Sequence, residues 1–248
     1  MATVSEPAIR TERHDDFFDE DGLPWLENGE RLDQETFHER YKHLPPDFRA
    51  ELVEGVVYVM PSPLKIKHAR GDFSMTGWLY LYGSATPGTR GQSNATTILS
   101  DRSEPQPDSA LLILAEFGGQ SRDGEDDYTH GAPELVVEVA WSSRSLDLHA
   151  KLRDYERAGV KEYIVRDLRD RIIHWFALGD GKFEPLTADP DGLFRSRSFP
   201  GLWLDPAPLF AEDFAAVNAA VARGLASPEH AAFVAELRRR RDARAAGD

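Results

Sequence analysis

The sequence predicts a mixed α/β domain built on a βαβ unit. The stretch 133–167 (PELVVEVAWSSRSLDLHAKLRDYERAGVKEYIVRD) opens with one apolar run and closes with another. Between them, apolar residues recur at steps of three and four, which indicates an amphipathic helix over 146–158, and Gly159 stands at a helix C-cap position. A segment of this size fits two parallel neighbouring strands and their crossover helix, in a sheet covered by helices.

The N-terminal part predicts an acidic arm, a short helix and a hairpin. Residues 1–35 hold eleven acids and three bases, so we expect residues 1–30 to be a disordered extension of the main domain. A helix over 32–43 follows, with Asp33 as its N-cap. The run 51–60 predicts a hairpin that turns at Glu54-Gly55.

The next segments predict a second helix and two strands. Residues 65–82 fit a helix, with His68 in its first turns. A loop over 83–91 and a strand over 95–99 are expected next. Pro107-Asp108 opens a strand over 110–114, an entrance where proline is tolerated. The polar stretch 116–130 predicts a long loop.

After the βαβ unit, the sequence predicts antiparallel strands and then helices. Strands over 171–177, 182–186 and 195–199 are expected to extend the sheet. Apolar stripes after residue 209 indicate a helical extension over 210–248, so the domain itself is placed at 31–209. The extension ends in the run 238–241, four arginines that a solvated helix end explains.

Composition limits the functional classes. The chain has no cysteine, which excludes disulfides and thiolate metal sites. It has no apolar run of membrane-spanning length and no signal-peptide core, so we expect a soluble cytoplasmic protein. The net charge of −14 argues against a general nucleic-acid binder, because such proteins usually carry a basic surface.

The candidate site begins with Glu138, a carboxylate inside an apolar strand, where it is costly unless paired or bound to a metal. Asp108 enters another strand, and Lys151 lies on the crossover helix. Two carboxylates suit Mg²⁺, which keeps several waters. A lysine beside the metal can stabilise developing charge. Glu51 is a candidate further ligand or base.

Each candidate also has a structural explanation. Glu138 could point outward at a sheet edge, and Asp108 could end a turn. Lys151 follows Asp147 by four residues, so the two could form a surface ion pair on the helix. His68 is a candidate proton carrier or phosphate contact, although a histidine in such a place is more often a partly buried helix residue.

Taken jointly and in order, several motifs resemble the Uma family of restriction-endonuclease-like proteins, in the PD-(D/E)xK nuclease superfamily. The resemblance covers roughly residues 32–209. The matching segments are Glu51-Leu52-Val53-Glu54-Gly55 with Pro61 and His68, Pro107-Asp108, Pro133 to Val139, Asp147, Lys151 and Tyr155, Ala158-Gly159-Val160 with Glu162-Tyr163, and Phe199-Pro200-Gly201-Leu202-Trp203.

The resemblance implies a restriction-endonuclease-like core, a central mixed sheet flanked by helices, with Asp108 and Glu138 as metal ligands. The sequence departs from the superfamily pattern at Ala140, where a lysine is usual, and the resemblance carries that role to Lys151. A second departure is Trp141-Ser142, where many members have Ser-Pro.

Two functions are therefore expected. The first is an endonuclease dependent on Mg²⁺ or Mn²⁺ that hydrolyses DNA, with Lys151, Glu51 and His68 assisting the metal ligands. Because duplex cleavage usually needs two sites, a homodimer is expected, with the C-terminal helices as candidate contact. The second is a non-catalytic module of the same fold that binds DNA or protein, which the acidic charge favours.

Overall fold

The central sheet has six strands in the order β11-β10-β9-β8-β5-β3. Only β8 and β9 are parallel; the other neighbours are antiparallel. The computed structural model describes residues 24–60 and 65–246. The strands of this sheet are β3 (Thr89–Ser93), β5 (Ser109–Ile113), β8 (Leu135–Ala140), β9 (Glu162–Asp167), β10 (Ile172–Gly179) and β11 (Lys182–Leu186).

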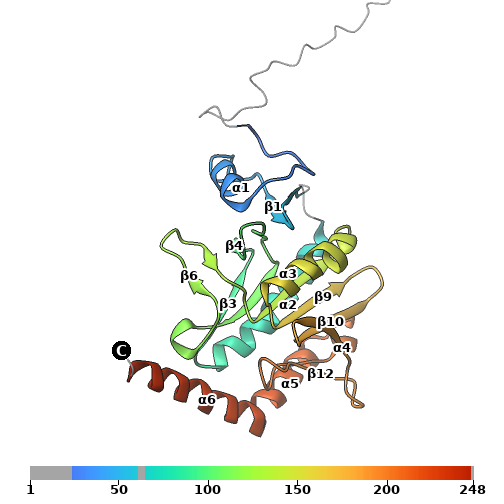
Figure 1. The fold of residues 1–248 in the computed structure, drawn as a ribbon. Coiled ribbons are helices and arrows are strands. Elements are labelled where there is room, and N and C mark those ends of the chain that lie inside the picture. The colour runs from blue at the N-terminus through green and yellow to red at the C-terminus, as the bar shows by residue number, and fades with distance from the viewer. Residues whose placement is uncertain (1–23, 61–64, 247–248) are drawn as a thin grey trace, which may run out of the picture.

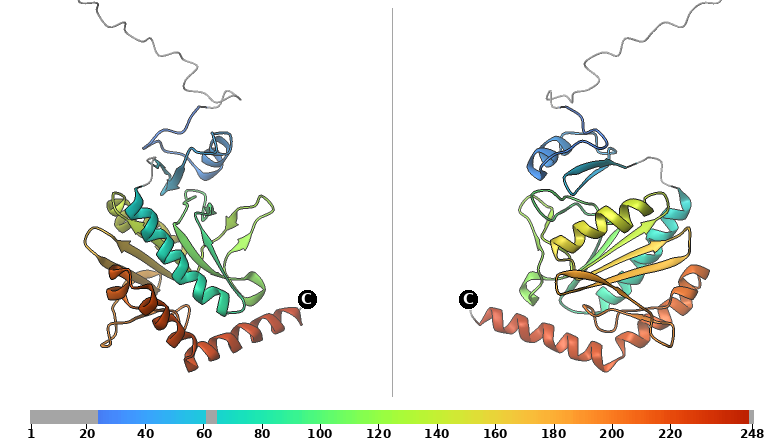
Figure 2. Two further views of the ribbon diagram at one scale, coloured as in Figure 1. Left: turned by 180° about the vertical axis from the view of Figure 1, so that it is seen from behind. Right: turned by 45° about the vertical axis from the view of Figure 1, so that its right-hand side comes forward.

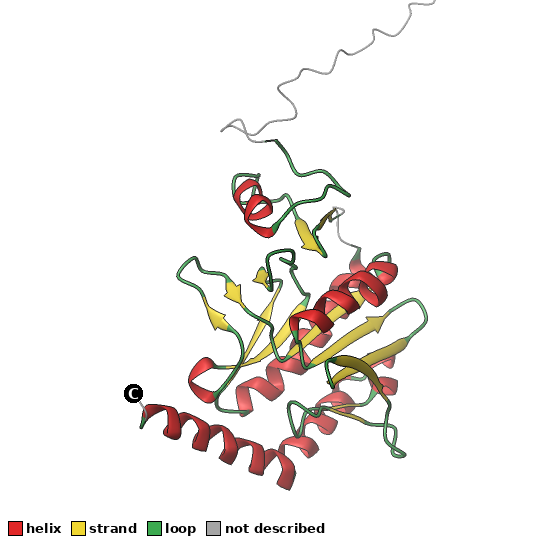
Figure 3. Ribbon diagram, in the orientation of Figure 1, coloured by secondary structure: helices red, strands yellow, loops and turns green. Residues whose placement is uncertain are grey.

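Helices cover both faces of this sheet (Figure 1, Figure 3). One face packs against α2 (Ile66–Ala85), with the C-terminal helices behind it. The other face packs against the crossover helix, which consists of a π-helical start, η3 (Leu146–Lys151), and α3 (Leu152–Ala158). The C-terminal helices are α4 (Pro206–Ala211), α5 (Phe214–Leu225) and α6 (Pro228–Ala245). The mixed sheet flanked by helices and the parallel βαβ unit were both predicted from the sequence and are confirmed.

A small N-terminal layer lies over one end of the sheet (Figure 1, Figure 2). It contains α1 (Gln34–Tyr41) and the hairpin of β1 (Ala50–Val53) and β2 (Val56–Val59). Both turn residues, Glu54 and Gly55, have positive φ, as a two-residue hairpin turn requires. An apolar cluster of its own holds this layer together. Asp33 caps α1 as predicted, accepting a hydrogen bond from the Thr36 amide at 2.8 Å.

Residues 24–30 belong to this layer and not to a solvated arm. Leu26 is buried among the apolar side chains, and Arg40 donates two hydrogen bonds to the Glu30 carboxylate. The predicted arm therefore extends too far along the chain; its remaining part, residues 1–23, lies outside the described residues.

Five of the remaining predictions differ clearly from the structure. The helix predicted over 65–82 continues to Ala85, so the predicted loop over 83–91 contains the helix end and β3. β3 was missed because it is an edge strand with mostly polar, exposed residues. The strand predicted over 95–99 is only β4 (Thr97–Ile98), in a small sheet with β7 (Thr129–His130) and β6 (Arg122–Asp123). Those two strands, with the 3-10 helix η2 (Ala115–Phe117), occupy the predicted loop over 116–130.

The third predicted antiparallel strand, 195–199, does not extend the sheet. Only β12 (Phe194–Arg195) forms there, and it pairs with β13 (Trp203–Leu204). Pro190 and Pro200 flank this segment, and proline cannot donate a ladder hydrogen bond, so a longer strand is disfavoured. None of the helices in the described part of the chain is long and apolar enough to cross a membrane.

Candidate active site

Glu138 lies in the middle of β8 and faces the crossover helix. Side chains alternate along a strand, so Glu138 shares its face with Val136 and Ala140, which pack in the cluster beneath α3. Only 4% of its surface is exposed. The structural explanation, an outward-facing carboxylate at a sheet edge, is therefore excluded, because β8 has neighbours on both sides.

Lys151 supplies the counter-charge to this carboxylate. Its ammonium donates to Glu138 Oε1 at 2.9 Å and to Glu51 Oε1 at 2.9 Å. Lys151 is buried, so it does not form a surface pair with Asp147. Burial alone would lower the pKa of Lys151, but the charges of Glu138, Glu51 and Asp147 outweigh it and raise that pKa well above its usual value. The lysine is therefore held as a cation.

Glu51 reaches the site from the hairpin, 100 residues away in sequence from Lys151. Besides the Lys151 ammonium, the backbone amide of Gln106 donates a hydrogen bond to Glu51 Oε1 at 2.7 Å. Glu51 Oε2 receives no hydrogen bond with acceptable geometry in the described part of the chain, although it lies 2.8 Å from the Lys151 ammonium. This ion pair joins the N-terminal layer to the βαβ unit.

Asp108 immediately precedes β5 and lies beside Glu138 of the neighbouring strand β8. The antiparallel strands β5 and β8 pair Ser109 with Val137. Asp108, one position before Ser109, and Glu138, one position after Val137, therefore approach one another. Asp108 Oδ2 accepts a hydrogen bond from the Val139 amide at 2.7 Å. Burial raises the pKa of Asp108 to about 6, against the opposing charge of His68. It is nevertheless the more accessible carboxylate, with 15% of its side chain exposed against 5% for Glu138.

His68 lies at the accessible side of the site. It projects from the first turns of α2, and its Nε2 is 3.6 Å from Asp108 Oδ2, within ion-pair range but beyond a hydrogen bond. About a fifth of the His68 side chain is exposed. Glu138, Lys151 and Glu51 are almost fully covered, whereas His68 and Asp108 are partly exposed, so among the described residues the site is most accessible beside His68 and Asp108.

Two further residues take part that were not predicted as site residues. The hydroxyl of Tyr155 donates to Glu138 Oε1 at 2.8 Å. Asp147, considered from the sequence as a surface partner of Lys151, is instead buried beside it and accepts a hydrogen bond from Ser143. Both stand four residues from Lys151, one on each side, and this spacing on one helix face could have identified them. The π-helical geometry of η3 is a form often found at functional sites.

The cluster has more carboxylates than cations. Burial raises the pKa of Glu138 well above its usual value, against the opposing charge of Lys151, while Asp108 and Glu51 add to the rise. Four acids, Glu51, Asp108, Glu138 and Asp147, surround one ammonium. Such an imbalance in a buried place is relieved by a bound cation or by protonation.

The donor set fits a hard divalent cation that keeps water ligands. Within the described residues, the hydrogen bonds to Glu138 fall on Oε1 and those to Asp108 on Oδ2, which leaves one oxygen of each for a metal. No three acidic or histidine side chains there are grouped so that they could hold a metal by themselves. Two carboxylate oxygens completed by water are a usual Mg²⁺ arrangement.

The family model described as "Putative restriction endonuclease", Uma2, matches residues 35–207, more than half of the chain. The chain belongs to the Uma2 family. This confirms the resemblance drawn from the sequence motifs. No curated protein sequence matches the chain.

A solved structure supports the Uma2 fold of the chain. It is described as "a putative nuclease belonging to DUF820" from Anabaena variabilis ATCC 29413. The two proteins are 16% identical, with a TM-score of 0.53 over 70% of this chain and 96% of the other. At this identity the likeness shows a shared fold. The restriction-endonuclease-like architecture predicted for this Uma2 protein therefore agrees with a known structure.

Proposed function

We propose that this protein is a metal-dependent endonuclease that hydrolyses phosphodiester bonds in DNA. One observation carries the proposal: Lys151, a buried ammonium, bonds Glu138 and Glu51 beside Asp108. A purely structural ion pair would need only one carboxylate for the ammonium. Here several carboxylates surround the Lys151 ammonium, and the site is partly exposed at Asp108 and His68. The family description, which names a restriction endonuclease, and the nuclease named for the structural neighbour support the same activity.

Asp108 and Glu138 would hold Mg²⁺ or Mn²⁺ through their free oxygens. The bound ion would polarise a phosphoryl oxygen and lower the pKa of a coordinated water. Tyr155 and Lys151 fix Glu138 through its other oxygen, so its orientation does not depend on the ligand.

Lys151 is proposed to orient the attacking water and to stabilise the charge that develops on the phosphoryl group. Glu51, from the hairpin, also pairs with the ammonium of this lysine. His68, at the accessible side, is placed to contact a phosphate or to carry a proton. Cleavage of both strands of a duplex would require two such sites, which is the reason to expect a homodimer.

The test is calorimetric titration with Mg²⁺ and Mn²⁺, followed by incubation with supercoiled plasmid. Wild type should bind metal, and Glu138→Gln and Asp108→Asn should bind at least about tenfold more weakly, since each removes one ligand charge. Asp126→Asn is the matched control, because Asp126 is an exposed carboxylate paired with His130 outside the site. Lys151→Met, assayed at a temperature where circular dichroism shows the variant to be folded, should keep metal binding but lose metal-dependent nicking.

The outcomes separate the two functions considered from the sequence. Metal binding without nicking by wild type would favour a non-catalytic module of nuclease-like fold, in keeping with the net charge of −14. No metal binding by wild type would refute the proposed chemistry and leave the buried group as a structural ion cluster.

A further inference from the structure

The C-terminal apolar stripes, candidates for a dimer contact, are largely used within the chain, although Phe214 is 43% exposed. Val217 and Val221 of α5 and Leu237 of α6 are buried in the main core. The remaining large apolar surface lies elsewhere. Of the five exposed large hydrophobic residues in the described part of the chain, three lie on α2.

Those three residues form one stripe. Ile66, Phe73 and Tyr80 are spaced seven apart, so they project from the same side of the helix. Their exposed fractions are 66%, 79% and 69%. Gly77 lies between the last two, and a Cβ added there would meet no neighbour within 4 Å. Single exposed apolar residues are common, but an aligned series on a long helix marks an interaction surface.

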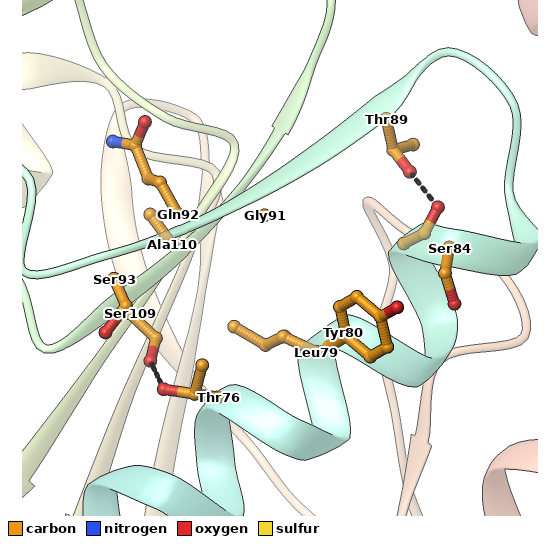
Figure 4. Close-up of a pocket in the computed structure, with 11 residues that line it drawn as sticks. Thr76, Leu79, Tyr80, Ser84, Thr89, Gly91, Gln92, Ser93, Ser109 and Ala110 are labelled. Atoms are coloured by element: carbon orange, nitrogen blue, oxygen red, sulfur yellow. Dashed lines mark hydrogen bonds between the residues drawn. The ribbon is translucent and has the colours of Figure 1, made fainter.

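A pocket opens beside the stripe, between α2 and the edge strand β3 (Figure 4). Its volume is about 380 Å³, enough for an aromatic side chain. The helix contributes Thr76, Leu79, Tyr80, Gly83 and Ser84, and the strand contributes Thr89 and Gly91 to Ser93. The same helix therefore carries an exposed aromatic side chain, Phe73, and a cavity about two turns further on.

We propose that this face binds a second copy of the chain, with the two α2 helices antiparallel and the twofold axis near Gly77. In that arrangement, Phe73 of each copy lies opposite Tyr80 of the other and enters the pocket beside it. Phe73 and Tyr80 are about 10 Å apart along the axis, on opposite sides of Gly77. A twofold contact must be self-complementary, and this helix offers both halves of such a contact.

The charges along α2 favour the same arrangement. Lys65 lies at the N-terminal end, which has no acidic residue in its first turn. A cation there is unfavourable with the helix's own dipole and favourable at the C-terminal end of another helix. Antiparallel pairing places Lys65 at that end of the partner, whereas Lys67 lies over the Trp141 ring of its own chain. Exposed Glu116 lies nearby, since its neighbour Phe117 is in contact distance of Gly88.

The first test is sedimentation equilibrium of the full chain over a wide concentration range. Wild type should be a dimer, and Phe73→Asp should raise the dimer dissociation constant at least about tenfold. Ile172→Asp is the matched control, because Ile172 is an exposed apolar residue on β10 away from the stripe; it should stay dimeric. A monomeric wild type, or a dimer that Phe73→Asp leaves intact, would overturn the proposal.

The second test locates the axis. The chain has no cysteine, so one introduced cysteine can cross-link only to its equivalent in another copy. Gly77→Cys should form an intermolecular disulfide under mild oxidation, because the two residues would face each other across the axis. Ser84→Cys, on the same stripe but displaced from the axis, should not. Cross-linking at Ser84 instead of Gly77 would refute the antiparallel arrangement.

This inference deepens the expectation of a dimeric nuclease, but its readouts do not use activity. Loss of nicking in the metal-site variants therefore leaves it untouched, and a monomeric wild type leaves the metal chemistry untouched. If Phe73→Asp weakens binding of duplex DNA to a monomeric wild type, the stripe is a nucleic-acid contact and the dimer is excluded.

Discussion

The ammonium of Lys151 lies 2.9 Å from Glu138 Oε1, in a place where neither side chain is more than 5% exposed. The parallel strands β8 and β9 force the crossover helix back over the sheet, and this brings the two residues together although 13 positions separate them. Burial of either charge alone would be costly, so each stabilises the ionised form of the other.

Replacing Lys151 by methionine should strongly destabilise the fold. The substitution leaves Glu138 and Glu51 buried without their counter-ion, and we expect the free energy of unfolding to fall by about 3–5 kcal/mol. Urea denaturation measures this. Adding Glu138→Gln should restore part of the loss, since one stranded charge is then removed. Lys182→Met, which breaks an exposed pair with Glu156, should cost less than about 1 kcal/mol. If Lys151→Met and Lys182→Met lowered the free energy of unfolding equally, Lys151 would not be the counter-ion of buried carboxylates.

Tyr155→Phe tests the second bond to Glu138. The variant keeps the aromatic ring but removes the hydroxyl that donates to Oε1, and should lower the free energy of unfolding by about 1–2 kcal/mol. The cost should shrink in a Glu138→Gln background, because the two groups are directly coupled. Tyr163→Phe is the control: its hydroxyl donates to the Asp147 carbonyl, so its cost should be the same in both backgrounds. An unchanged Tyr155 cost would show that the hydroxyl does not support the carboxylate.

Much of this site could be predicted because it follows from local patterns. An acid inside an apolar strand and a helix returning over that strand determine that Glu138 and the helix face each other. Contacts between distant segments were harder. Glu51 meets Lys151 only because the hairpin folds over the end of the sheet, and no local period encodes that placement. Burial of Lys151 was also ambiguous, since a partner four residues away suggested an exposed pair.

The missed elements have physical reasons too. β3 has the sequence TRGQS, which lacks apolar alternation because an edge strand need not bury either face fully. The π-helical start of the crossover helix has no sequence signal of its own, since apolar spacing distinguishes helix from strand but not one helical pitch from another.

Two glycines of α2 should respond oppositely to alanine. A Cβ at Gly71 would lie 2.7 Å from Val139 Cγ1, where the helix crosses β8, so Gly71→Ala should cost about 1–3 kcal/mol through overpacking. Within one chain a Cβ at Gly77 meets nothing, so Gly77→Ala should stabilise the monomer by about 0.5–1 kcal/mol, as expected for a helix interior. Thermal unfolding of both variants, at concentrations where the chain is monomeric, measures the two effects. If both destabilise equally, close approach of helix and strand is not the reason for glycine at position 71.

Asp154 should contribute more to the stability of the protein in mild acid than at neutral pH. Burial raises the pKa of Asp154 to about 6, against its hydrogen bond from Ser103, with Glu54 and Arg157 nearby. In the unfolded chain this carboxyl titrates near its ordinary value of about 4. Between these values the folded state binds more protons than the unfolded state, so Asp154's contribution to stability falls as pH rises from about 4 to 6.

Asp154→Asn should remove this dependence, because the amide is neutral at every pH and its oxygen can still accept from Ser103. Chemical denaturation at pH 7 should show the variant more stable than wild type by about 2–3 kcal/mol, the equivalent of the pKa difference. The gap should shrink toward pH 4 and close near pH 3, below the ordinary pKa of about 4, where Asp154 is protonated in both states. Glu156→Gln, on the same helix but with its pKa lowered chiefly by the hydrogen bond from Lys182, should show no such gain at pH 7. A gap for Asp154→Asn that stays constant from pH 4 to 7 would show that the carboxyl is not protonated in the folded protein within this range.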